Sequence, residues 1–161
     1  MVEDFPGKEE SLTILPKQIL NGLKLPKNEG IRNMKKDIED RKDIEILINA
    51  FYDKVRKDEV IGYIFNDVAK VDWEHHTPII CDFWENILFQ SNVYRGNPMA
   101  THIKLNTLSP LTTPHFDRWK KLFTEAVDEY FEGKNAELAK QRAISIGTMM
   151  QIKIIETTPT G

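Results

Sequence analysis

The stretch VDWEHHTPIICDFWENILF, residues 71–89, decides the fold class of this chain. Residues at spacings of three and four predict a helix with one apolar face, formed by Trp73, His76, Ile80, Phe83 and Ile87. Asp72 stands where a helix N-cap belongs, and Pro78 falls within the first two turns, where its missing N–H costs least. Adjacent helical residues point about 100° apart. His76 is therefore expected to face inward and His75 outward.

Three other segments show the same helical periodicity. Their predicted apolar faces are Ile44, Leu47, Ile48, Phe51 and Val55; then Phe116, Trp119, Phe123, Ala126 and Tyr130; and, after Gly133, Ala139, Ala143, Ile146 and Met150. Asp43 is a plausible cap or first-turn acid of the first segment. Between residues 90 and 114, many Asn, Thr, Ser and Pro residues leave room only for a short helix at 99–105. No convincing strand pattern occurs, so the class is all-α.

The composition limits the possible functions. With 161 residues, the chain is long enough for one domain with a real core. A net charge of -3 disfavours nucleic acid as a partner, and no apolar run reaches the roughly 20 residues of a membrane span. Cys81 is the single cysteine, which excludes an intrachain disulfide and multi-cysteine metal sites.

Residues 1–33 differ from the remainder in composition. They contain three prolines, three glycines and mixed charges, so they are predicted to form a flexible N-terminal extension before a domain at 34–161. The start MVEDFPGKEE lacks the apolar region of a secretory signal. We therefore expect a cytoplasmic location.

The histidines carry most of the functional information. On its apolar face His76 needs a partner, because an unpaired buried polar group costs about 1–3 kcal/mol. It is either a core-edge imidazole bonded to a backbone carbonyl or a pocket residue. His102, in GNPMATHIKL, is either an exposed loop residue or a metal ligand on a short helix. His115 begins a helix and is expected to meet solvent or the helix terminus.

The aromatic residues extend this picture. Tyr52 and Trp119 each carry a donor that needs an acceptor if it is buried. An inward histidine, a second histidine on a short helix and many aromatics are the ingredients of a haem pocket. Two alternatives remain: a cofactor-free all-α interaction module, and a non-haem metal site formed by His75, His76 and His102.

Five segments resemble the truncated haemoglobins, and most closely their third group. They are AFYDKVRKDEVIGYIFN (50–66), VDWEHHTPIICDFWENILF (71–89), YRGNPMATHIKL (94–105), PLTTPHFDRWKKLF (110–123) and RAISIGTMMQIKI (142–154). Together they cover, in order, most of the chain from about residue 42 to 154. The extension at 1–33 falls outside the resemblance.

The resemblance implies a shortened globin, a two-over-two helical sandwich around haem b. His102, in the stretch from Gly96 to His102, would be the iron ligand. Phe65 would pack on the haem, and Ile80 and Phe83 would contact it as the wall of the cavity. Residues that face a ligand on the distal side would be Tyr52, His76 and Trp119.

The resemblance also implies a function. Such a protein binds O2 and other diatomic ligands such as NO or CO. Polar distal donors hold a ligand tightly and slow its release, which suits O2/NO redox chemistry better than bulk transport. A nitric oxide dioxygenase-like or peroxidase-like activity is possible, with a reductase or another electron donor as partner. The sequence leaves the reaction and the orientation of His76 open.

Overall fold

The computed structural model describes residues 34–159, and within this range every regular element is a helix. The elements are α2 (Arg41–Lys57), the short π-helix η2 (Ile64–Val68), α3 (Trp73–Phe89), α4 (Pro98–Leu108), α5 (Thr113–Tyr130) and α6 (Lys134–Thr157). This confirms the all-α prediction. The extension predicted at 1–33 lies outside the described residues. None of the described helices is long and apolar enough to cross a membrane.

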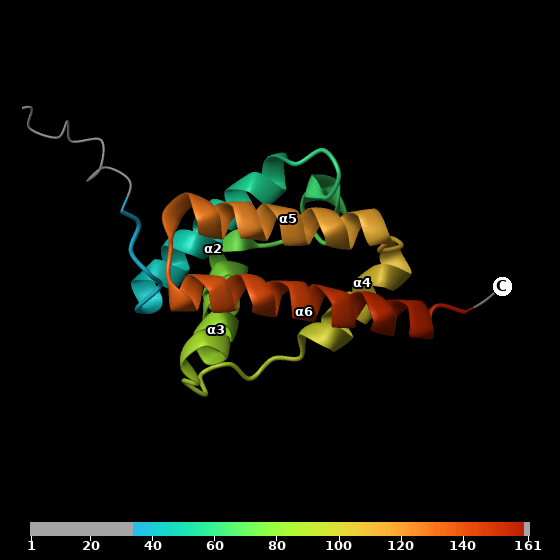
Figure 1. Cartoon of the computed structure of the whole chain (residues 1–161). Coiled ribbons are helices and arrows are strands. Elements are labelled where there is room, and N and C mark those ends of the chain that lie inside the picture. The colour runs from blue at the N-terminus through green and yellow to red at the C-terminus, as the bar shows by residue number, and fades with distance from the viewer. Residues whose placement is uncertain (1–33, 160–161) are drawn as a thin grey trace, which may run out of the picture. The chain divides into compact units, whose positions relative to one another are not determined.

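The four long helices form two pairs. α2 packs against α3 and α5, whereas α6 packs against α5, α3 and α4. Figure 1 shows α5 and α6 side by side in front, with α2 and α3 behind them. This is the predicted two-over-two arrangement. α4 joins it mainly through α6.

The core face of α2 is the predicted one, since Ile44, Leu47, Ile48, Phe51 and Val55 are all buried. The core face of α3 differs from the prediction. Its fully buried residues are Cys81, Trp84 and Leu88, and the predicted stripe from Trp73 to Ile87 is only half-buried. Trp84 on this face stacks on Phe123 of α5 at 4.5 Å between ring centroids. The face with Cys81, Trp84 and Leu88 therefore turns toward the core, and the His76 stripe lies at its edge.

Helix boundaries follow local hydrogen bonds. Asp40, not Asp43, caps α2, because its carboxylate accepts from the Asp43 N–H at 3.1 Å. Asp43 is the first-turn acid, buried and paired with Lys36 at 2.7 Å. Asp72 caps α3 as predicted. At the start of α5, the imidazole of His115 accepts from the Thr112 N–H, so this histidine lies at the helix terminus as expected.

Two expectations about extent and burial were wrong. α4 runs from Pro98 to Leu108 and is longer than the predicted helix at 99–105. Tyr130, predicted to join the core face of α5, is exposed because it is the last residue of the helix.

Candidate functional site

An aromatic cluster surrounds Tyr52 on α2. Its ring lies 4.8 Å from that of Trp73, 6.0 Å from Phe65 and 6.3 Å from His76, measured between centroids. Phe65 stacks on Trp73 at 6.1 Å, and Trp73 lies edge-on to His76 at 6.2 Å. Three elements, α2, η2 and α3, therefore place a phenol and an imidazole side by side.

Burial sets the protonation of both polar groups in this cluster. It raises the pKa of Tyr52, so the hydroxyl remains a donor at neutral pH. It also lowers the pKa of His76, and the charges of His102 and His75 lower it further. His76 is therefore neutral at pH 7, with one N–H and one lone pair. His76 is half-buried and His75 exposed, which confirms the predicted orientation of the pair.

The segment before His102 explains how that histidine is held. A side chain at Gly96 would collide with Tyr94, because an added Cβ would meet the hydroxyl end of the Tyr94 ring. Asn97 caps α4 by accepting from the Ala100 N–H at 3.1 Å, and Pro98 follows as the first helical residue. The Pro98 carbonyl oxygen then lies 2.6 Å from Nδ1 of His102. The short run Gly96–Pro98 thus both starts α4 and orients the imidazole one turn later.

This contact determines the tautomer of His102. A carbonyl oxygen only accepts, so Nδ1 carries the hydrogen and Nε2 keeps its lone pair. Burial lowers the pKa of His102, although the hydrogen bond to Pro98 acts in the opposite direction. A neutral imidazole whose other ring nitrogen donates to a backbone carbonyl is the usual form of a histidine metal ligand.

The remaining predicted site residues lie at the edge of the core. Phe65, Ile80, Phe83 and Trp119 are partly buried and pack against the main cluster. Ile80 and Phe83 follow His76 on the same side of α3. Trp119 reaches the Tyr52 cluster through Phe51, on which it lies edge-on at 5.7 Å. The structure thus joins Tyr52, His76 and Phe65 directly, and connects Trp119 to them by one intervening ring.

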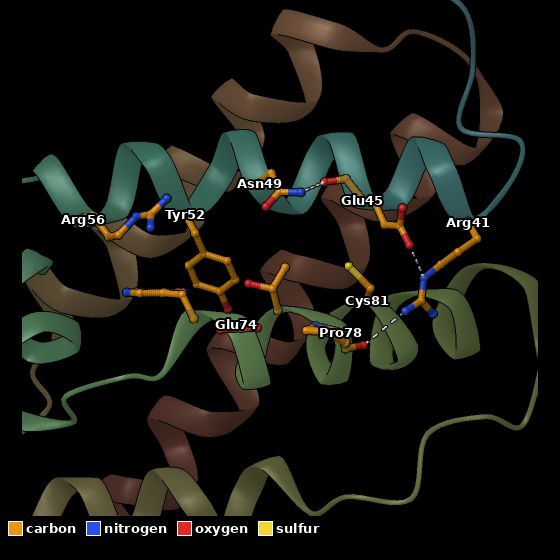
Figure 2. A pocket seen from close by; sticks show the side chains of 10 residues that line it. Arg41, Glu45, Asn49, Tyr52, Arg56, Glu74, Pro78 and Cys81 are labelled. Atoms are coloured by element: carbon orange, nitrogen blue, oxygen red, sulfur yellow. Dashed lines mark hydrogen bonds and ion pairs between the residues drawn. The ribbon is translucent and has the colours of Figure 1, made fainter.

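A groove of about 400 Å³ opens between α2 and α3, and Tyr52 and Trp73 both contribute to its lining (Figure 2). Its rim is charged, since Arg41 there bonds Glu45 at 3.2 Å and the Pro78 carbonyl at 3.3 Å. Cys81 lies at the bottom, and burial raises the pKa of its thiol to about 11. His76 and His102 do not line this groove. Its polar character also differs from the flat apolar slot that haem needs.

Some residues of the site region were missed by sequence reasoning. Trp73 was placed on the apolar face of α3 and not in the site, yet it contacts Tyr52, Phe65 and His76. The sequence did offer one signal, because Trp73 lies three residues before His76 and therefore on the same face of the helix. On the side of His102, Met99 and Ile103 pack against a second small cluster formed by Phe116, Met150 and Ile154.

The three-histidine metal site gains no support from this geometry. Among residues 34–159, no three His, Cys, Asp or Glu side chains gather closely enough to hold a metal ion. His75 points outward, and His102 lies on a different helix from the pair.

Comparison with known proteins identifies the class. The sequence profile of the bacterial-like globin family matches residues 36–153, so the chain belongs to that family. It is 31% identical over 121 residues to the group 3 truncated hemoglobin ctb of Campylobacter jejuni, covering 73% of this chain and 93% of the relative. The crystal structure of the group III truncated hemoglobin from Campylobacter jejuni superposes with a TM-score of 0.68. That match has 30% identity and covers 78% of this chain and 99% of the other. Both matches identify it as a group III truncated haemoglobin.

The family implies haem, and the residues present fit this group. Haem needs one imidazole with a free lone pair and an apolar surrounding. His102 offers the first through Nε2. Half-buried apolar side chains from α3, α4 and α5 offer the second. The donor set is therefore compatible with haem.

Proposed function

We propose that this chain binds haem b through Nε2 of His102 and uses the opposite side for small ligands. The observation that carries the proposal is the 2.6 Å contact between Nδ1 of His102 and the Pro98 carbonyl. It leaves the coordinating nitrogen unprotonated and holds the ring against rotation. Phe65, Ile80 and Phe83 would contact the haem ring, since each is an apolar side chain at the edge of the core.

Tyr52, His76 and Trp119 would form the ligand side of the site. Burial keeps the Tyr52 phenol protonated, and His76 is neutral with one N–H, so both can donate to a polar ligand at neutral pH. The indole N–H of Trp119 would be a third donor. Haem, when bound, supplies an iron that binds O2, NO or CO and exchanges electrons.

This donor set supports O2/NO redox chemistry rather than bulk transport. A hydrogen bond to a strongly polarised ligand is worth about 1.5–3 kcal/mol, which slows release about tenfold to a hundredfold. Slow release hinders a carrier but gives a second reactant time to arrive. The chemistry needs a reductase or another electron donor as partner. The proposal includes a location in the reducing cytoplasm, where such donors operate.

The replacement His102→Ala tests the proposal. We expect the purified variant to lack stable haem, seen as loss of the Soret band and of extractable haem. His75→Ala is the matched control, because His75 is exposed and should leave haem binding unchanged. A His102→Ala protein with a normal haem spectrum would refute the assignment.

The unsubstituted chain distinguishes the alternatives. Protein that folds without any colour when haem is supplied would favour a cofactor-free interaction module. Colourless protein with stoichiometric zinc would favour a non-haem histidine site.

A further inference from the structure

The outward face of α6 carries large apolar side chains. Ile144, Met149, Ile152 and Ile155 are 49%, 65%, 52% and 64% exposed, and we call these four residues the α6 stripe. The opposite face of the helix, with Ala139 and Ala143, is buried against its neighbours. In Figure 1, α6 lies in the front layer and no other described helix covers it. Exposed apolar residues grouped on one face mark an interaction site rather than chance exposure.

We propose that the α6 stripe pairs with the same stripe of a second copy of this chain. The two helices would run antiparallel, with a two-fold axis at Met149. In such an isologous contact, residues at equal distances before and after the axis meet. Ile144 lies five residues before Met149 and Ile155 six residues after it, so across the axis the two come within one residue, about 1.5 Å of helical rise, of direct opposition. Met149 meets its own counterpart.

Charge complementarity supports the antiparallel direction. Arg142 and Glu156 each lie seven residues from Met149, so they meet across the proposed axis. They are separated by nearly four full helical turns and therefore border the stripe on the same side. Antiparallel pairing brings Arg142 of each copy to Glu156 of the other. A parallel pair would instead place two Arg142 side chains together.

Both charged residues are available for this contact. Arg142 is exposed and takes part in none of the ion pairs found in residues 34–159. Glu156 is also exposed, and pairs only with Lys153 on its own helix at 3.3 Å. An exposed pair of this kind is weak and exchangeable. Glu156 can therefore exchange Lys153 for Arg142 of the second copy without losing a buried ion pair.

The size of the stripe indicates a weak dimer. Stable interfaces bury about 800 Å² per partner. One stripe of four side chains on a single helix provides less than that. We therefore expect a dissociation constant in the micromolar range or above, so that dimerisation is visible only as a dependence on protein concentration.

Sedimentation velocity of the full chain tests the proposal, over roughly 1 to 500 µM, a range chosen for weak interfaces. We expect the dimer fraction to rise with concentration. Ile152→Glu should leave a monomer throughout. Ile46→Glu is the matched control, because Ile46 is 47% exposed on α2, away from the stripe, and should dimerise like the parent chain. Circular dichroism and thermal unfolding verify that each variant is folded.

A charge exchange tests the direction of pairing. Arg142→Glu and Glu156→Arg should each weaken the dimer about threefold to tenfold, and the double variant should recover the parent affinity. A chain that stays monomeric over the whole range would overturn the proposal. So would a dimer that Ile152→Glu leaves intact. A double variant that does not recover would overturn the antiparallel register.

Discussion

At the scale of single residues, Tyr52 shows how burial prepares a group for ligand binding. Its phenol is enclosed by aromatic rings from α2, η2 and α3, which hold the side chain in one orientation. Because burial raises its pKa, the hydroxyl keeps its proton at neutral pH. Under the proposed function, this hydroxyl donates to the bound ligand.

We expect Tyr52→Phe to speed O2 release at least several-fold and up to about a hundredfold, because one donor to a polarised ligand is lost. Stopped-flow displacement of O2 from the ferrous protein measures the rate. Tyr63→Phe is the control, since Tyr63 is exposed and its hydroxyl contacts His115 at 3.3 Å. An unchanged rate in Tyr52→Phe would remove Tyr52 from the ligand site.

His76 and His102 differ in how far the sequence could predict them. His76 was placed inward by periodicity alone, because its helix is long and regular. Spacing alone also allowed His102 to be an exposed loop residue, because the helix around it is short and its hydrogen-bond partner is the backbone of Pro98. Spacing left both an exposed loop residue and a metal ligand open for His102, and the resemblance favoured the ligand. The role of each residue remains a prediction.

At the scale of elements, the ion pair between Asp58 and Arg118 joins the end of α2 to α5. The Asp58 carboxylate is 3% exposed and lies 2.6 Å from Nε of Arg118. It also accepts from the backbone N–H groups of Val60 and Ile61. Burial alone would raise the pKa of Asp58, but Arg118 and the two N–H groups outweigh it and hold the pKa below its ordinary value.

We expect Asp58→Asn to lower the free energy of unfolding at pH 7 by about 1–2 kcal/mol, less than for a fully buried pair because Arg118 is one-third exposed. A carboxylate with a lowered folded-state pKa stabilises above its unfolded pKa, about 3.9, and loses this effect as the pH falls through the folded value. The difference from the parent chain should therefore shrink below about pH 4.

Urea unfolding at several pH values measures this effect. Asp53→Asn provides the control, because Asp53 is 59% exposed in its pair with Arg56. It should change stability little. A difference for Asp58→Asn that grows on acidification would contradict the assigned sign.

Elements with regularly spaced apolar residues were predicted better than elements without such a pattern. The four long helices follow from regular apolar spacings, and the cap of α3 follows from Asp72. The π-helix η2 has no repeating pattern in five residues, so periodicity could not indicate it. The face of α3 was misjudged because spacing does not show which of its two tryptophans meets α5. Trp84 stacks on Phe123, whereas Trp73 lies at the edge of the core.

At the scale of the whole molecule, the family match spans residues 36–153 and omits the extension. We therefore expect a chain of residues 34–161 alone to fold and bind haem as the full chain does. The haem spectrum and the thermal unfolding midpoint of the two proteins provide the comparison. Loss of haem or of folding in the shorter chain would show that residues 1–33 are structural.

The arrangement of helices came from the resemblance rather than from periodicity. Periodicity identifies apolar faces, but it does not say which faces meet, because several packings bury the same residues. The five matching segments together supplied that information. The pairing of α2 with α3 and of α5 with α6 was therefore predicted from the resemblance to known globins, and the contacts in the structure agree with it.

The burial of Cys81 has a consequence for durability. Peroxide and oxidants derived from nitric oxide attack a thiolate far faster than a thiol. With 1% of its surface exposed and a pKa of about 11, Cys81 is almost entirely protonated at neutral pH. It is also the single cysteine of the chain, so no second thiol can form an intrachain bridge with it. Under the proposed function the protein would meet reactive oxygen and nitrogen species, and its one sulfhydryl is held in the form that such species damage slowest.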